Sequence, residues 1–145
     1  MPYMLFAFIA GAALSLQALI NARLAAGLGG ALWAAAVSFF VGGAGLLGVQ
    51  LATRATWPAM ERAAAIPYWV WCGGFLGAVF VSSVIASVPR LGNTSVFGLV
   101  IFGQLAASLL LDHFGVLATN PHPVNAVRLI GAALVLGGAV MVLKG

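Results

Sequence analysis

Long apolar stretches, separated by short polar or helix-breaking segments, dominate the 145-residue chain. A membrane-spanning helix needs about 20 mostly apolar residues, because the hydrocarbon core of a bilayer is about 30 Å thick. Five stretches meet this requirement, at residues 3–26, 31–52, 67–88, 94–111 and 124–143. The pattern predicts an all-α polytopic membrane protein in which residues 1–145 form a single domain of five transmembrane helices.

Glycine and proline mark the connections between these stretches. Gly27–Gly30 is predicted to separate the first two helices, and Pro89–Asn93 to form a tight, helix-breaking link between the third and fourth. The longest loop covers residues 53–67, and a loop with two prolines covers residues 118–125. Aromatic residues typical of a membrane–water interface lie near the ends of the stretches. They are Trp33, Trp57, Tyr68, Trp69 and Trp71.

Composition supports the membrane assignment, since 63% of the residues are hydrophobic and only 6% are charged. A soluble domain carries about 25% charged residues. The formal net charge of +4 comes from six lysines and arginines spread along the chain, a distribution that does not indicate nucleic-acid binding. The first stretch has no basic residue before it, so we expect it to remain as a membrane helix. One cysteine, Cys72, excludes an intrachain disulfide, and no metal or cofactor is predicted.

The basic residues give no preferred orientation. If the five helices alternate in direction, three basic residues lie at each side of the membrane: Arg54, Arg62 and Arg128 on the N-terminal side, and Arg23, Arg90 and Lys144 on the other. A clear excess on one side normally fixes orientation. Equal numbers either arise by chance or indicate insertion in both directions. Because transporters commonly consist of two inverted repeats and no internal repeat is evident here, we predict an antiparallel homodimer of ten helices.

Several polar side chains fall inside the predicted helices. Gln17 and Asn21 are four residues apart and share a helical face. Their amides either join helices by hydrogen bonds or line a substrate pathway. A similar stripe runs along the fourth helix, and the third helix has Ser83 and Ser87, which either bind solute or bond to their own helix backbone. The stripe of the fourth helix consists of Asn93, Gln104 and Ser108.

Acidic residues are nearly absent. Glu61 lies in a loop, and Asp112 ends the fourth helix next to His113. Asp112 and His113, with Arg90, either form a gate or proton relay or mark solvated helix ends. No nucleophile has a neighbouring base and no residues have metal-binding spacing, so we do not expect an enzyme.

Small residues along the last helix allow close helix packing, and we assign them to dimer contact. They are Gly131, Ala133, Gly137 and Gly138.

Three segments together resemble the small bacterial YdcZ-type inner-membrane family of the drug/metabolite transporter superfamily. They are "SLQALINARLAAGLGGALWAAAVSFFVGG" (15–43), "FGQLAASLLLDHFG" (102–115) and "RLIGAALVLGGAVMVL" (128–143). The resemblance implies a multi-pass exporter in the bacterial inner membrane and dual-topology pairing. It makes Gln17, Asn21 and Gln104 the first candidates for the pathway, followed by Trp33 and Ser38. The related small multidrug exporters use a glutamate in the first helix, and this chain has none there.

These observations predict a small-solute transporter that works by alternating access and binds its solute through amide and hydroxyl groups. The expected partners are an unidentified small solute, the lipid bilayer and a second copy of the chain. A passive dual-topology channel and a non-transporting membrane subunit are the alternatives. Saturation and counter-exchange distinguish a carrier from a channel, whereas unchanged function of glutamine variants would indicate a subunit.

Overall fold

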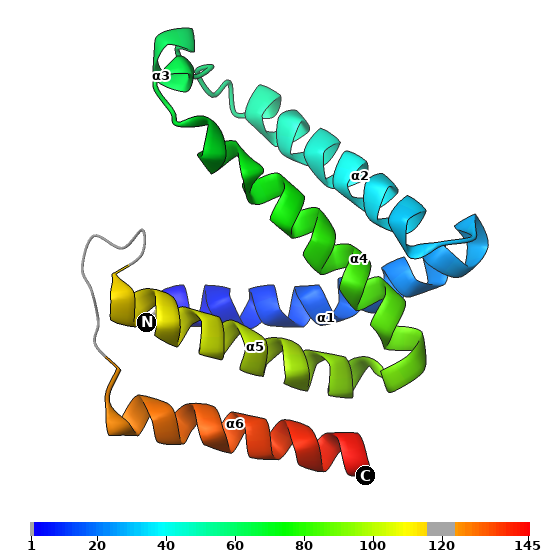
Figure 1. Cartoon of the computed structure of the whole chain (residues 1–145). Coiled ribbons are helices and arrows are strands. Elements are labelled where there is room, and N and C mark those ends of the chain that lie inside the picture. The colour runs from blue at the N-terminus through cyan, green and yellow to red at the C-terminus, as the bar shows by residue number, and fades with distance from the viewer. Residues whose placement is uncertain (1, 116–123) are drawn as a thin grey trace. The chain divides into compact units, whose positions relative to one another are not determined.

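The computed structural model describes residues 2–115 and 124–145, in which the regular structure is entirely helical (Figure 1). The elements are α1 (Pro2–Leu28), α2 (Ala31–Ala52), α3 (Met60–Ala64), the 3-10 helix η1 (Tyr68–Cys72), α4 (Gly73–Leu91), α5 (Asn93–Phe114) and α6 (Ala126–Lys144). Five segments are long and apolar enough to cross a membrane, with η1 and α4 together forming the third. The five predicted spans are thus confirmed.

Two predicted helix ends are wrong because glycines stop the helices later than expected. Helix α1 continues to Leu28, and the turn falls at Gly29, whose φ of 79° suits a residue without a Cβ. Helix α5 continues from the expected end at residue 111 to Phe114. Gly115, with φ 63°, then donates its N–H to the carbonyl oxygens of Asp112 and Leu111. This left-handed glycine is a common helix terminator.

The link expected at Pro89–Asn93 is shorter than predicted. Pro89 lies within the last turn of α4, which continues to Leu91, and Gly92 alone separates α4 from α5. Pro89 has no N–H to donate to the carbonyl of Ile85 one turn earlier, yet the helix continues past it for two residues. Gly92 has φ 79°, a conformation that suits glycine, so α4 ends next to a glycine rather than at the proline. Most of the expected loop at 118–125 lies outside the described residues.

The chain consists of two units, residues 1–88 and 89–145, which we call the N-terminal and C-terminal units. In the N-terminal unit, α1 and α2 pack together near the Gly29 turn and diverge away from it (Figure 1). Ala34 and Ala35 of α2 and Ile85 of α4 are buried there, and Leu24, Ala25, Ala31 and Val81 pack around them. Alanine at this position lets the helix backbones approach closely.

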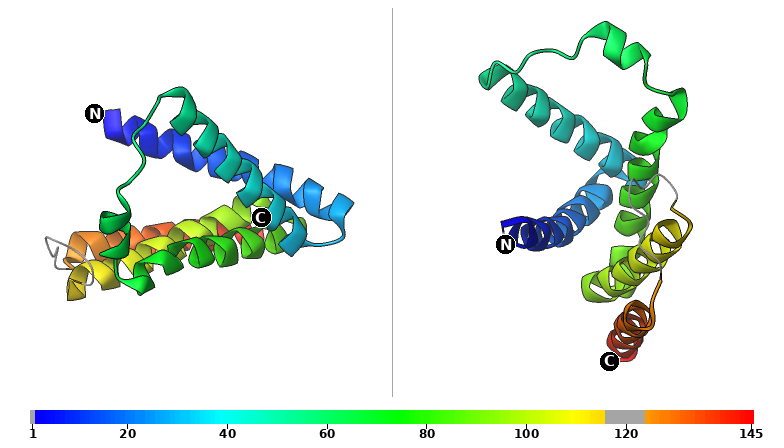
Figure 2. Two further views of the ribbon diagram at one scale, coloured as in Figure 1. Left: turned by 90° about the horizontal axis from the view of Figure 1, so that it is seen from above. Right: turned by 90° about the vertical axis from the view of Figure 1, so that its left-hand side faces the viewer.

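In the C-terminal unit, α5 and α6 run antiparallel, side by side (Figure 2). Gly98 of α5 lies against Ala139 of α6, which is only 4% exposed. A Cβ atom added at Gly98 would lie 3.1 Å from the Cβ of Ala139. A larger residue at position 98 would therefore force its neighbours on α6 to move by a few tenths of an ångström.

Gly98→Val is expected to lower the stability of the C-terminal unit by about 1–3 kcal/mol, because overpacking forces the two helices apart. SDS titration of the purified protein in mixed micelles would measure the loss. Gly103→Val is the matched control, since it makes the same change on α5 where no atom lies within 4 Å of the added Cβ. Equal destabilisation by both variants would contradict this packing.

Most of the surface of each span is left uncovered. In the most apolar part of each span, only 6% to 11% of the residues are buried. Large side chains point outward along whole helices, among them Phe8, Phe40 and Phe75. In a membrane protein such surface contacts lipid or another chain.

Candidate functional site

The N-terminal unit brings together two of the predicted pathway residues, Asn21 of α1 and Ser38 of α2. The amide nitrogen Nδ2 of Asn21 donates a hydrogen bond to the hydroxyl oxygen of Ser38 at 3.1 Å. Asn21 is 4% exposed. Burying an amide without a partner costs free energy, so this contact explains how α1 accommodates Asn21 against α2. Of the two predicted roles, the geometry of this pair matches interhelical bonding.

A double-mutant cycle of Asn21→Ala and Ser38→Ala is expected to give a coupling free energy of about 0.6 kcal/mol, the average for hydrogen bonds between membrane helices. Unfolding by SDS would supply the four stabilities of the cycle. Pairing Asn21→Ala with Ser83→Ala is the control, because the exposed Ser83 is not hydrogen-bonded to Asn21 in the structure. A coupling no larger than that of the control pair would show that the Asn21–Ser38 bond does not hold α1 to α2.

Gln17 lies one helical turn before Asn21 but is exposed. Its side chain makes no hydrogen bond within the part of the chain that the structure describes. Because α1 spans Pro2–Leu28, Gln17 is close to the middle of this span. Trp33, near the start of α2, is also exposed, at 68%. Gln17 and Trp33 are therefore available to a solute or to another chain.

The two serines of α4 identified from the sequence, Ser83 and Ser87, differ in their contacts. The hydroxyl of Ser87 donates to the backbone carbonyl of Ser83 at 2.7 Å, so the prediction of bonding to the preceding helical turn is confirmed for Ser87. The Ser83 side chain is exposed. The Ser83 hydroxyl does not make the corresponding bond to the preceding turn of the described helix α4.

The C-terminal unit holds an ion pair between the ends of its two helices. The guanidinium nitrogen Nη1 of Arg128 lies 3.3 Å from the carboxylate Oδ2 of Asp112. Both side chains are a little over one third exposed. The Asn125 side chain caps α6 by accepting a hydrogen bond from the backbone N–H of Arg128 at 2.9 Å. Asp112 is therefore held by a partner on α6, while its neighbour His113 is exposed and contacts Phe114 edge to face.

A groove of about 390 Å³ extends along α5 and α6 from this ion pair toward the middle of the helices. Its walls are mostly apolar, and Asp112, Arg128 and the hydroxyl-bearing Ser108 supply the polar groups. The lining residues are Leu105, Ser108, Leu109, Asp112, Arg128, Gly131, Ala132 and Val135. Ser108 and Asp112, predicted from sequence as solute-binding and gating residues, thus line one groove.

Gln104 lies near the middle of α5 and is exposed. Like Gln17, it makes no side-chain hydrogen bond within residues 2–115 and 124–145. Asn93 begins α5 and is half-buried, and Arg90 is exposed in the last turn of α4. The stripe predicted along α5 therefore begins at a half-buried asparagine and continues through an uncovered glutamine to the Ser108 groove.

The small residues of α6 fall on two sides of the helix. At 100° per residue, Gly131 and Gly138 share one face, about 90° around the helix from Ala139, which faces α5. Ala133 and Gly137 lie on the opposite side. All four are exposed, and an added Cβ at Gly131, Gly137 or Gly138 would meet no atom within 4 Å.

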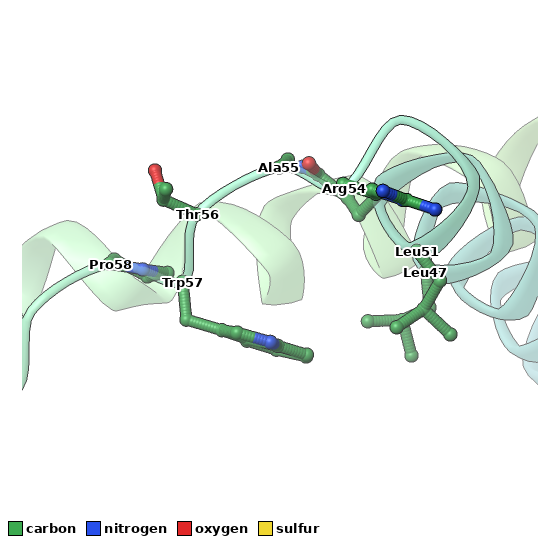
Figure 3. Close-up of a pocket in the computed structure, with 8 residues that line it drawn as sticks. Leu47, Leu51, Arg54, Ala55, Thr56, Trp57 and Pro58 are labelled. Carbon is green, nitrogen blue, oxygen red and sulfur yellow. The ribbon is translucent and has the colours of Figure 1, made fainter.

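A second groove, of about 260 Å³, lies where α2 ends (Figure 3). The indole of Trp57 and the side chains of Leu47 and Leu51 extend to the same side of the loop. Gln50, Arg54, Ala55, Thr56 and Pro58 complete the lining. Arg54 has φ 50°, so it is a non-glycine residue in the left-handed region.

Sequence reasoning did not pair Arg128 with Asp112 and did not identify the Arg54 groove. The sequence did contain a signal for the Asp112–Arg128 pair. If the helices alternate in direction, these two oppositely charged residues lie at the same side of the membrane. The groove depends on a backbone conformation of Arg54 that favours glycine, and sequence pattern does not indicate it.

Comparison with known proteins gives one match. The chain has no significant match among curated proteins and none among solved structures. Residues 2–141 match the family described as "Putative inner membrane exporter, YdcZ". This match covers the first four spans and most of the fifth, in agreement with the resemblance seen in three segments of the sequence. The chain therefore belongs to the YdcZ family and is a multi-pass protein of the inner membrane.

Proposed function

We propose that the chain exports a small solute as an antiparallel homodimer that works by alternating access. The observation that carries the proposal is the exposure of two amides, Gln17 in α1 and Gln104 in α5, each near the middle of a span. An amide facing hydrocarbon without a partner is costly. Each amide therefore needs a water-filled cavity, a bound solute or a second chain beside it.

In this proposal, a second, inverted copy of the chain covers the exposed amides of Gln17 and Gln104. Three basic residues at each side of the membrane favour insertion in both directions. The low burial of every span leaves room for extensive contact with another chain. Two inverted copies would reproduce the inverted-repeat plan of many transporters, in which substrate binds near the middle of the membrane.

The proposed solute is bound by hydrogen bonds. Primary amides both donate and accept, as do hydroxyl groups, so they can bind neutral, zwitterionic or anionic solutes. Gln17 and Gln104 are the central residues of the proposed site. Its remaining members are Trp33, Ser83, Asn93 and Ser108. Asn21 and Ser38, which bond to each other, instead join α1 to α2. Asp112 with His113 on one side of the membrane, and Arg90 on the other, are the proposed gate or relay residues.

Solute identity can be found by comparing the culture media of cells with and without the protein. A compound enriched outside expressing cells is then labelled and tested in proteoliposomes. A carrier is expected to show saturable flux and acceleration by unlabelled solute on the opposite side. Absence of any enriched compound and of any such flux would contradict the export proposal.

A passive channel is the second candidate, favoured by the position of the acids. Glu61 lies in α3 outside the spans, and Asp112 lies in the last turn of α5. No described acid is therefore available for proton coupling in the middle of a span. A channel predicts flux without saturation and without counter-exchange, so the same proteoliposome assay separates the two.

Gly137→Leu is expected to weaken the proposed dimer, because Gly137 lies on the side of α6 that faces away from α5 and a leucine there would block close approach. Cross-linking in membranes and the mass of the detergent complex would measure association. Gly131→Leu is the comparison. Gly131 was also assigned to dimer contact from the sequence, but it lines the groove inside the C-terminal unit, so this change is expected to weaken the dimer less. A dimer unaffected by Gly137→Leu would exclude this face as the interface.

A further inference from the structure

The groove at the end of α2 has the three features that an anionic phospholipid requires. Its floor is formed by the apolar side chains of Leu47, Leu51 and Trp57. Arg54 supplies a positive charge beside that floor. The groove also lies where a span ends, since α2 stops at Ala52. We propose that this groove binds one anionic phospholipid, with the phosphate at Arg54 and the start of an acyl chain along Leu47, Leu51 and Trp57.

The charge of Arg54 is not neutralised within the chain. The sequence has two acids. Asp112 pairs with Arg128, and no carboxylate of the described residues lies within 4.0 Å of a nitrogen of Arg54. A guanidinium group offers several N–H donors in a geometry that matches phosphate oxygens. An anionic headgroup would therefore supply a counter-charge that the chain itself does not.

The backbone at Arg54 adopts a left-handed conformation that is costly for a residue other than glycine. The N–H of Arg54 donates to the carbonyl of Leu51 at 3.1 Å, and the N–H of Ala55 donates to that of Gln50 at 3.0 Å. This is the Schellman pattern of helix ends, in which the left-handed residue is usually glycine. Arginine adopts this left-handed conformation less readily than glycine does. It places a guanidinium group directly at the end of the span.

The apolar floor selects a lipid over a soluble anion. Trp57 is 73% exposed although it lies beside two leucines, and its ring is suited to the interface between headgroups and hydrocarbon. The Thr56 hydroxyl extends to the opposite side of the loop in Figure 3. Within the groove, Arg54 would therefore bind the headgroup, and Leu47, Leu51 and Trp57 would contact the acyl chain of the lipid.

The test uses the full-length protein in neutral detergent micelles. Trp33, Trp69 and Trp71 are replaced by phenylalanine, so that Trp57 is the remaining fluorophore. Phosphatidylglycerol with brominated chains is then titrated, with brominated phosphatidylcholine as the neutral lipid. We expect saturable quenching by phosphatidylglycerol at concentrations about fivefold below those needed for phosphatidylcholine, the factor that one membrane-surface arginine contributes.

Arg54→Gln is expected to remove this difference between the lipids, whereas Arg62→Gln, which removes one charge from the same loop, is expected to retain it. Arg54→Gly tests the same loss with a residue that suits the backbone, so reduced binding cannot be attributed to a disturbed helix end. Equal quenching by both lipids in the starting protein would overturn the proposal. So would equal loss in Arg54→Gln and Arg62→Gln, or full competition by inorganic phosphate.

Discussion

Replacing Gln17 or Gln104 by alanine is expected to reduce export at least about fivefold while leaving the fold intact. Both side chains are exposed, so their removal takes away no packing within the chain. If the proposed site is correct, each variant leaves a polar group of the bound solute unpaired. Such a loss costs about 1–3 kcal/mol, and 1.4 kcal/mol is a factor of ten in affinity. Initial rates of solute uptake into inverted vesicles would measure the effect.

Two leucines provide matched controls for this experiment. Leu16 and Leu110 lie on the same two helices and are each 60% exposed. Leu16→Ala and Leu110→Ala remove side chains of similar size without removing a hydrogen-bonding group, so they are expected to retain transport. Normal transport by both glutamine variants would exclude Gln17 and Gln104 from the pathway. A non-transporting subunit would also show unchanged behaviour of these variants, and it would give no solute flux in any form of the protein.

The number and type of the helices could be predicted from the sequence because apolar length determines what can cross a bilayer. The helix ends were harder to predict. Gly29, Gly92 and Gly115 each adopt positive φ and mark the true ends. Other glycines lie inside helices, and among them Gly77 and Gly98 lie close to Phe39 and Ala139 of another helix. Pro89 was a misleading signal, since α4 continues past it to Leu91.

Spacing along one helix could predict which polar residues share a face, but not their partners. Asn21 was expected either to bond to another helix or to line a pathway, and Ser38 was a separate candidate. Only the packing of α1 on α2 showed that they bond to each other. The partner of Asp112 depended on pairing two different helix ends. Arg54 required knowledge of a backbone torsion angle. Contacts between elements and unusual backbone conformations are tertiary properties, which a one-dimensional pattern does not contain.

Single charge changes are expected to fix the orientation of the chain, because three basic residues at each side leave it balanced. Lys144→Gln leaves three on the N-terminal side against two, so the N-terminus should become cytoplasmic and the C-terminus periplasmic. Arg62→Gln makes the opposite change and should place the C-terminus in the cytoplasm. A C-terminal reporter pair, one active in the cytoplasm and one in the periplasm, would read both sides in the starting protein and one side in each variant.

Co-expression of the two variants turns orientation into a test of the dimer. If transport needs two inverted copies, a population fixed in one orientation lacks its partner and should lose most activity. Producing Lys144→Gln and Arg62→Gln together restores both orientations and should restore transport, although neither variant carries any change in the proposed site. Each variant alone also keeps every residue of that site, so its inactivity could not arise from lost solute contacts. Full transport by either variant alone, with its reporter on one side only, would show that an inverted partner is not required.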